Sequence, residues 1–153
     1  MNVNYITNRQ EFEAALAELW TIPKLCADFE TTGLDARVHE PRLLQLCTTQ
    51  EDVEDRTVYV IDFFKCKDID GLKALIESRQ MLLFHNANFD LQFFLKLGID
   101  FKKKIFDTFI AERCLRAGYK EKKVSPKTEK VFFGDVSCSL KAVVSRRLEI
   151  EIS

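Results

Sequence analysis

The chain reads LCADFETTGLD over residues 25–35, an apolar run that ends in two acids and a glycine-containing loop. The pattern predicts a β-strand, and residues two apart lie on the same face of a strand. Asp28 and Glu30 then lie side by side at the strand end. Two carboxylates this close repel each other unless a cation neutralises them, and Mg²⁺ in proteins is often held by only one or two carboxylates. The alternative is a strand end that carries two solvated acids.

A second segment adds a third acid. Residues 81–95 read MLLFHNANFDLQFFL, which predicts a short buried strand, a polar turn and an amphipathic helix. Asn86 is placed to be the helix N-cap, and Phe89 and Phe93 fall on one helical face. Asp90 then lies close to the start of the helix and projects beside the strand ends. Three carboxylates from two elements favour a metal site.

Both segments resemble motifs of the DEDD family of 3′→5′ exonucleases, and are most similar to ribonuclease D and the proofreading domain of bacterial DNA polymerase I. The segment DFETTGLD at 28–35 resembles the first motif of the family, and HNANFD at 85–90 resembles the second. The flanking segments PRLLQL at 41–46 and FDT at 106–108 also fit the family pattern. The resemblance runs from about Val3 to about Leu148. It implies a ribonuclease H-like three-layer α/β/α fold with a mixed sheet, whereas periodicity alone indicates only an α/β fold.

The resemblance also implies roles for individual residues. Asp28, Glu30 and Asp90 would be the catalytic residues and the ligands of a two-metal site for Mg²⁺ or Mn²⁺. The substrate would be the 3′ end of single-stranded DNA or RNA, and the sequence does not distinguish the two. The residues expected to bind this substrate are Thr31, Leu34, Asn86 and Phe89.

One part of the family pattern is absent. The third motif is a tyrosine or histidine followed four residues later by an aspartate, on a late helix. Tyr119 is the only late tyrosine, and Lys123 stands four residues after it. We therefore expect a C-terminally incomplete exonuclease-like domain over residues 1–153, with one side of the two-metal site missing, and a complementing chain or homo-oligomer as a partner.

Composition sets further expectations. A chain of 153 residues with 46% hydrophobic residues predicts a single domain. No run of 18 apolar residues is present, so no membrane partner is expected. The five cysteines are scattered singly, which argues against a disulfide framework or a zinc site. A cytoplasmic location is the resulting prediction.

Charge is distributed unevenly along the chain. Residues 1–100 contain 10 Lys and Arg against 17 Asp and Glu, whereas residues 101–153 contain 13 against 7. Phosphate binding depends on local positive charge. The basic third is therefore expected to flank the carboxylates, or to be a solvated face. The candidates are Lys102, Lys103, Lys104, Lys120, Lys122, Lys123, Lys127, Lys130, Arg146 and Arg147.

The pattern predicts helices around 12–19, 69–76, 86–98, 107–115 and 140–148, and strands at 25–29, 42–48, 58–61 and 81–84. Asp107 is expected to cap the helix that follows it, in preference to binding metal. The lysine-rich segment from Gly118 to Cys138 is expected to be a flexible excursion.

The sequence is consistent with three hypotheses about function. The first is an exonuclease whose third motif is supplied elsewhere. The second is a protein that has lost cleavage and kept nucleic-acid or protein binding. The third is an unrelated α/β domain with accidental motifs.

Overall fold

The computed structural model describes residues 1–67 and 69–151. The chain forms two compact units, Met1–Asp107 and Thr108–Ser153. The expectation of one exonuclease-like domain over residues 1–153 stays a prediction.

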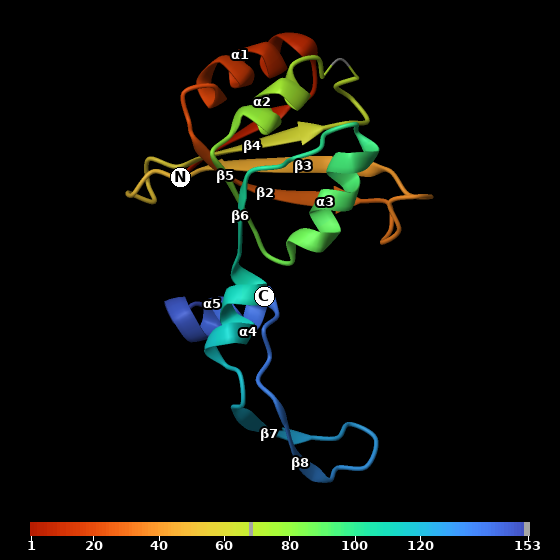
Figure 1. The fold of residues 1–153 in the computed structure, drawn as a ribbon, viewed down its shortest axis with the longest axis vertical. Coiled ribbons are helices and arrows are strands. Elements are labelled where there is room, and N and C mark those ends of the chain that lie inside the picture. Colours follow the sequence, from red (N-terminus) through yellow and green to blue (C-terminus); the bar gives the residue numbers. More distant parts are fainter. Residues whose placement is uncertain (68, 152–153) are drawn as a thin grey trace. The chain divides into compact units, whose positions relative to one another are not determined.

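The first unit is built on a six-stranded mixed sheet with the order β1-β4-β3-β2-β5-β6 (Figure 1). Its strands are β1 (Asn2–Ile6), β2 (Lys24–Thr31), β3 (Pro41–Thr48), β4 (Thr57–Asp62), β5 (Met81–Phe84) and β6 (Lys104–Asp107). β3 runs antiparallel to β2 and β4, whereas β5 runs parallel to both β2 and β6. The predicted α/β class and the ribonuclease H-like mixed sheet are confirmed.

One face of this sheet forms the hydrophobic core with three helices. The helices are α1 (Arg9–Leu19), α2 (Leu72–Ser78) and α3 (Ala87–Lys96). Alternate residues of β2, namely Leu25, Ala27 and Phe29, are buried in this core. The Phe29 ring packs edge-on against Phe94 at 4.8 Å between centroids and lies 6.0 Å from Phe93. β2, which carries two of the predicted acids, is therefore anchored directly to α3, which carries the third.

The opposite side-chain set of β2, Cys26, Asp28 and Glu30, is partly or fully exposed. This face continues through residues that the strand register places beside them, such as Leu83 and Cys47 next to Cys26. Asp28 and Glu30 thus lie on the sheet face turned away from the core of the first unit.

Two edge strands were not predicted from the sequence. β1 pairs in parallel with β4, and β6 pairs in parallel with β5. All but one of the residues of β1 are exposed, and β6 has no buried residue. Neither has the apolar pattern that marks a central strand, so only pairing with a neighbour defines them.

The second unit has almost no apolar core. It contains α4 (Thr108–Leu115), the hairpin strands β7 (Lys120–Val124) and β8 (Val131–Asp135), and α5 (Leu140–Leu148). The expectation of a flexible excursion over Gly118–Cys138 is wrong, because most of that segment forms this antiparallel hairpin. Among the described residues, no helix is long and apolar enough to cross a membrane.

An ionic cluster takes the place of a core in the second unit. Glu112 of α4 is only 3% exposed. Its carboxylate accepts hydrogen bonds from Arg116, from Arg146 at 3.0 Å and from Arg147 at 2.9 Å. Burial alone would raise the pKa of Glu112, but the three guanidinium groups lower it. The cluster ties α5 to α4.

A buried arginine connects α1, α2 and the segment that leads into β2. Arg79, only 4% exposed, donates hydrogen bonds to the carbonyl oxygens of Leu75 at 3.0 Å, Leu19 at 2.8 Å and Ile22. These oxygens belong to α2, to the last turn of α1 and to the segment that leads into β2. Cations near the C-terminal ends of helices are favoured by the helix dipole.

We expect Arg79→Met to destabilise the fold by about 3 kcal/mol, because three carbonyl groups would lose a charged donor within a buried site. The free energy of unfolding in urea, followed by circular dichroism, measures the effect. The exposed Arg9→Met is the matched control and should change stability by less than about 0.5 kcal/mol. Equal effects of the two substitutions would contradict this role for Arg79.

Candidate active site

The site begins at the last residues of β2. Asp28 and Glu30 alternate with buried Phe29, so both carboxylates project from the same face of the strand. The pairing with β3 becomes irregular between Glu30 and Thr31. Such irregularities re-aim side chains and are frequent beside active sites.

Asp90 reaches this strand from α3. Its Oδ1 accepts a hydrogen bond of 2.9 Å from the main-chain N–H of Phe29, and the residue is 2% exposed. β5 pairs with β2 only as far as Cys26, so the Phe29 N–H lies beyond the end of that ladder. The Asp90 carboxylate supplies the missing acceptor. The structure therefore brings the third predicted acid to the residue that separates the other two.

The electrostatics of the site follow from this arrangement. Burial, with a smaller contribution from the charges of Asp28 and Asp107, raises the pKa of Asp90 to about 7, against the lowering effect of the Phe29 N–H. Partial burial and the charge of Glu30 raise the pKa of Asp28, whereas His85 lowers it. The site holds more negative charge than it stabilises by itself, which favours protons or cations there.

Asp107 has a role that its sequence position did not reveal. It ends β6, in register with Phe84 at the end of β5. Its two carboxylate oxygens accept hydrogen bonds from the main-chain N–H groups of Asn86 at 3.0 Å and Ala87 at 2.9 Å. Asp107 therefore caps α3. Because α4 begins at the next residue, Thr108, the expectation that Asp107 also caps that helix stays a prediction. Capping in preference to metal binding fits this geometry.

Asn86 occupies the N-cap position of α3, as expected, but its side chain makes no capping hydrogen bond. Its backbone is left-handed, with φ of 72°. Asparagine tolerates this conformation better than most residues. The turn between β5 and α3 is thus held by Asp107, and the Asn86 side chain is exposed.

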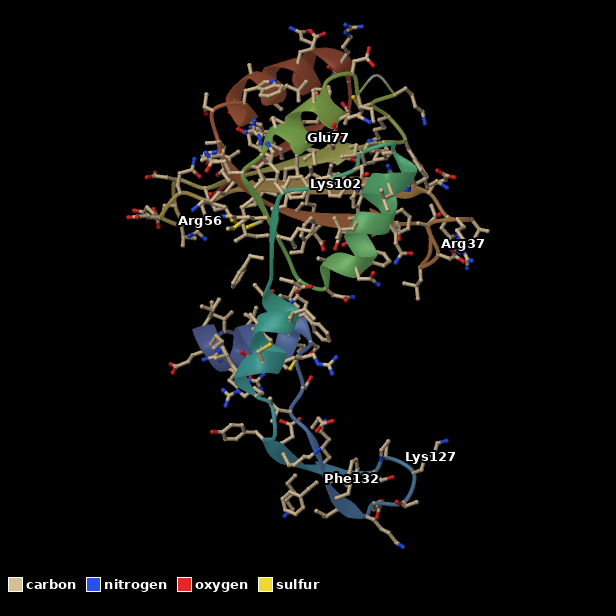
Figure 2. The ribbon with its side chains drawn as sticks, in the orientation of Figure 1. Arg37, Arg56, Glu77, Lys102, Lys127 and Phe132 are labelled. Atoms are coloured by element: carbon tan, nitrogen blue, oxygen red, sulfur yellow. The ribbon has the colours of Figure 1, made fainter. Side chains whose placement is uncertain are left out.

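The loop after β2 presents the remaining predicted substrate contacts. The Thr31 hydroxyl donates a hydrogen bond of 2.7 Å to the carbonyl oxygen of Gly33. A side chain at Gly33 would come within 2.4 Å of the His39 ring, so only glycine fits here. Leu34, beside it, is 83% exposed. Arg37, labelled in Figure 2, forms an ion pair of 2.7 Å with Asp35 in the same loop.

Phe89 lies on α3 beside Asp90 and is half-buried. Its ring packs at 5.2 Å from that of Phe93, which belongs to the core. Phe89 therefore bridges the core and the surface next to the acids, and only part of its ring is accessible.

Acidic oxygens under mutual repulsion suit a hard divalent cation. Asp28 and Asp90 have this character, and Glu30 is their neighbour. Within residues 1–67 and 69–151, however, no three acidic, histidine or cysteine side chains are arranged as a complete ligand set. The donor chemistry fits a metal ion, and the ligand set is incomplete.

The run Lys102–Lys104 does not lie beside the acids of the first unit. Lys104 is the first residue of β6 and is in register with Met81, which pairs with Lys24. The acids lie toward the opposite ends of these parallel strands. Lys24 and Asp28 are four residues apart, which is roughly 13 Å along a strand. The expectation that the run Lys102–Lys104 flanks the carboxylates is therefore wrong.

Several basic candidates already have partners. Lys102 forms an ion pair of 2.6 Å with Asp100, and Lys103 donates a hydrogen bond to the carbonyl oxygen of Ser78. Arg146 and Arg147 bind Glu112. These cations have structural contacts within their own units.

We expect Asp90→Asn to remove a pH-dependent loss of stability. The folded pKa of about 7 lies above the value of about 3.9 in an unfolded chain. The folded wild type therefore binds the extra proton, and its stability falls as the pH rises from about 4 to 7. Between pH 5 and pH 8 in EDTA, wild type should lose about 3 kcal/mol relative to Asp90→Asn, at about 1.4 kcal/mol per pKa unit. Urea unfolding at several pH values checks this, and parallel curves for the two proteins would contradict it.

We expect Asp107→Ala to destabilise the protein by about 1–2 kcal/mol, the usual cost of a lost helix cap. Two N–H groups at the start of α3 would lose their acceptor. Removing this neighbouring charge should also lower the pKa of Asp90. Thermal unfolding and NMR titration of the Asp90 carboxyl provide the two measurements. Asp100→Ala, an exposed acid of the same unit, is the control and should change neither.

The chain is similar in sequence to known exonuclease and polymerase proteins. Residues 3–153 match the family described as 3′-5′ exonuclease. DNA polymerase I of Aquifex aeolicus is 34% identical over 115 residues, which cover 75% of this chain and 18% of the polymerase. The chain thus spans less than a fifth of this curated relative.

Solved structures share the fold. Escherichia coli RNase D, an exoribonuclease involved in structured RNA processing, superposes with a TM-score of 0.69 and 18% identity, covering 100% of this chain and 35% of RNase D. Brucella melitensis NrnC bound to pGG gives a TM-score of 0.66 and 20% identity over 100% of this chain and 64% of NrnC. The same protein with bound Mg²⁺ gives 0.59 and 19%, over 100% and 65%. Because the family match covers residues 3–153 and the polymerase relative is 34% identical over 75% of the chain, this chain belongs to the 3′-5′ exonuclease domain family.

Proposed function

We propose that this chain is a metal-dependent exonuclease domain that hydrolyses single-stranded nucleic acid from its 3′ end. The observation that carries the proposal is the placement of Asp90 on the Phe29 amide, which holds its carboxylate close enough to Asp28 for that charge to raise the pKa of Asp90. The membership of residues 3–153 in the exonuclease family supports it.

Asp28, Glu30 and Asp90 would hold Mg²⁺ or Mn²⁺. Bound ions of this kind supply an activated water and stabilise a leaving oxygen. The chain itself contributes fixed ligand positions, because Asp90 is locked to β2 and β2 is locked to the core through the Phe29 ring. NrnC has been solved with Mg²⁺, which is consistent with this assignment.

The loop after β2 would receive the terminal nucleotide. Leu34 offers an exposed apolar side chain that can press against a base. The Thr31 hydroxyl donates a hydrogen bond to the carbonyl oxygen of Gly33, so its lone pairs remain available as acceptors for a substrate hydroxyl. Asn86 adds an exposed amide near the acids, and Phe89 a partly accessible ring.

We further propose that the missing acid of the third motif is supplied by a complementing segment or chain. In residues 1–153, no tyrosine or histidine is followed four residues later by an aspartate. The three acids would then bind one ion more firmly than a second. The isolated chain should cleave weakly or not at all, since removing one preorganised group from an active site commonly costs about 10²–10³-fold in rate. An inactive binding module is the second candidate, and the exonuclease family match does not favour it.

Metal binding tests the site without depending on activity. We expect Mn²⁺, measured by calorimetry, to bind wild type about tenfold or more tightly than Asp28→Asn or Asp90→Asn. We also expect binding to strengthen from pH 6 to pH 8, because Asp90 must lose its proton first. Asp100→Asn is the control acid. Equal Mn²⁺ affinity in all four proteins would remove the metal-site proposal.

Cleavage tests the reaction. A 3′-labelled and a 5′-labelled single-stranded oligonucleotide, as DNA and as RNA, are incubated with Mn²⁺ and the chain alone. The incubation is repeated with the polypeptide encoded just downstream. If the 3′ label is lost first in the mixture of the two polypeptides, and only when Asp28 is intact, the result supports a complemented 3′-5′ exonuclease. Strong cleavage by the chain alone overturns the complementation proposal, and silence in both arms overturns the enzyme.

A further inference from the structure

The hairpin of the second unit has two different faces. Because side chains alternate along each strand, cross-strand partners share a face. The pair Lys122 and Phe133 lies on one face, and the pair Lys123 and Phe132 on the other. We call them the Phe133 face and the Phe132 face. The Phe133 face consists of Lys120, Lys122, Val124, Val131, Phe133 and Asp135, and the Phe132 face of Glu121, Lys123, Phe132 and Gly134.

The side chains of the Phe132 face have contacts within the hairpin, although Phe132 itself is 48% exposed. A side chain at Gly134 would come within 3.0 Å of Lys123 Cδ and 3.3 Å of Phe132 Cε2, so these two side chains already fill the space above the glycine. Glu121 accepts a hydrogen bond of 3.1 Å from the Ser137 N–H and lies 3.3 Å from the Lys123 ammonium. Phe132, labelled in Figure 2, is thus less exposed than Phe133, at 48% against 73%.

The side chains of the Phe133 face are more exposed to solvent. Phe133 is 73% exposed, and Val124 and Val131 beside it are also exposed. Lys122, directly across from Phe133, forms no ion pair with any described residue. At the end of the face, Lys120 and Asp135 form an ion pair. An aromatic ring and an unpaired ammonium group thus stand together on a two-stranded sheet.

The surrounding charge selects the kind of partner. Residues 118–138 contain five lysines and three acids. Two of the lysines, Lys120 and Lys123, are paired within the hairpin. Lys127 and Lys130 lie in or beside the turn that joins the strands. The exposed apolar surface marks a binding site, and the excess of unpaired lysines favours a polyanion.

A cavity continues the surface at the base of the hairpin. It has a volume of about 440 Å³ and is lined by residues that include Phe109, Arg113, Arg116 and Asp135. The Arg113 guanidinium lies 5.6 Å from the centre of the Phe109 ring. Asp135 belongs both to this cavity and to the Phe133 face, so a second aromatic and cationic pair follows the first.

We propose that the Phe133 face binds single-stranded nucleic acid, with a base stacked on Phe133 and its phosphates near Lys122. Alternation of aromatic rings and cations is what unpaired bases and their phosphates require, because every base has a face that can stack. This inference rests on the proposed function, since it identifies a contact for the same substrate. It adds a substrate-holding site outside the three acids and their loop.

Binding is measured in EDTA, so that cleavage plays no part. A fluorescein-labelled oligo(dT) and an oligo(U) of the same length are titrated with the intact chain and followed by anisotropy. We expect Phe133→Ala to weaken binding about tenfold, within the range of about 1–3 kcal/mol for one stacked base. Lys122→Gln should reduce the slope of log K against log salt by about 0.7. The matched control Phe132→Ala should change the affinity by less than twofold.

Tryptophan variants give a direct readout that does not depend on the alanine variants folding correctly. Phe133→Trp should keep the affinity and show fluorescence quenching by the oligonucleotide, beyond that of Trp20 in wild type. Phe132→Trp should show no added quenching. Equal quenching in both, or an unchanged affinity in Phe133→Ala, would overturn the proposal. It would also be overturned if vesicles containing phosphatidylserine shifted the Phe133→Trp emission while oligonucleotides did not.

The two proposals fail separately. Asp28→Asn should weaken Mn²⁺ binding and abolish Mn²⁺-dependent cleavage by the chain mixed with the downstream polypeptide. If Phe133→Ala binds like wild type while Asp28→Asn blocks cleavage, the hairpin proposal falls and the exonuclease stands. If Phe133→Ala loses binding but Asp28→Asn neither binds less Mn²⁺ nor cleaves less, the hairpin stands as a binding site and the exonuclease falls.

Discussion

The hydrogen bond from the Phe29 N–H to Asp90 is the contact on which the site depends. It joins α3 to β2 at the one residue that separates Asp28 from Glu30. The Phe29 side chain acts in the same place from the other face of the strand, because its ring packs against Phe93 and Phe94 of α3. Core packing and the position of the acids are thus set by the same residue, and neither can shift without the other.

This contact has an electrostatic cost. Asp90 is buried beside Asp28 and Asp107, and its pKa rises to about 7. Perturbed carboxylates of this kind gather at functional sites. The fold sustains the repulsion because each acid is held by a specific main-chain contact or by the strand itself. Asp107 binds two N–H groups of α3, and Asp90 binds one of β2.

The two units are stabilised by different forces. The first has a contiguous apolar core formed by one sheet face and three helices. The second relies on the Glu112 cluster, in which buried charge is matched by three arginines. A unit with little apolar core leaves its own apolar side chains, such as Phe133 and Tyr119, at the surface. The lack of an apolar core in the second unit and the exposed apolar side chains of its hairpin therefore have the same origin.

The sequence by itself determined the central strands, the helices and the three acids, because burial on one face imposes a period of two or about 3.6 residues on apolar side chains. Strand alternation and the position of Asp90 near a helix start predicted that Asp90 lies beside the strand end that carries Asp28 and Glu30. Tertiary structure decided the rest. The edge strands β1 and β6 carry no buried face, so only pairing defines them. Asp107 caps α3 through a hydrogen bond between residues 21 positions apart. The hydrogen bond from the Phe29 N–H to Asp90 joins residues 61 positions apart. Local patterns contain no information about such contacts, because the partners meet only when the sheet is assembled.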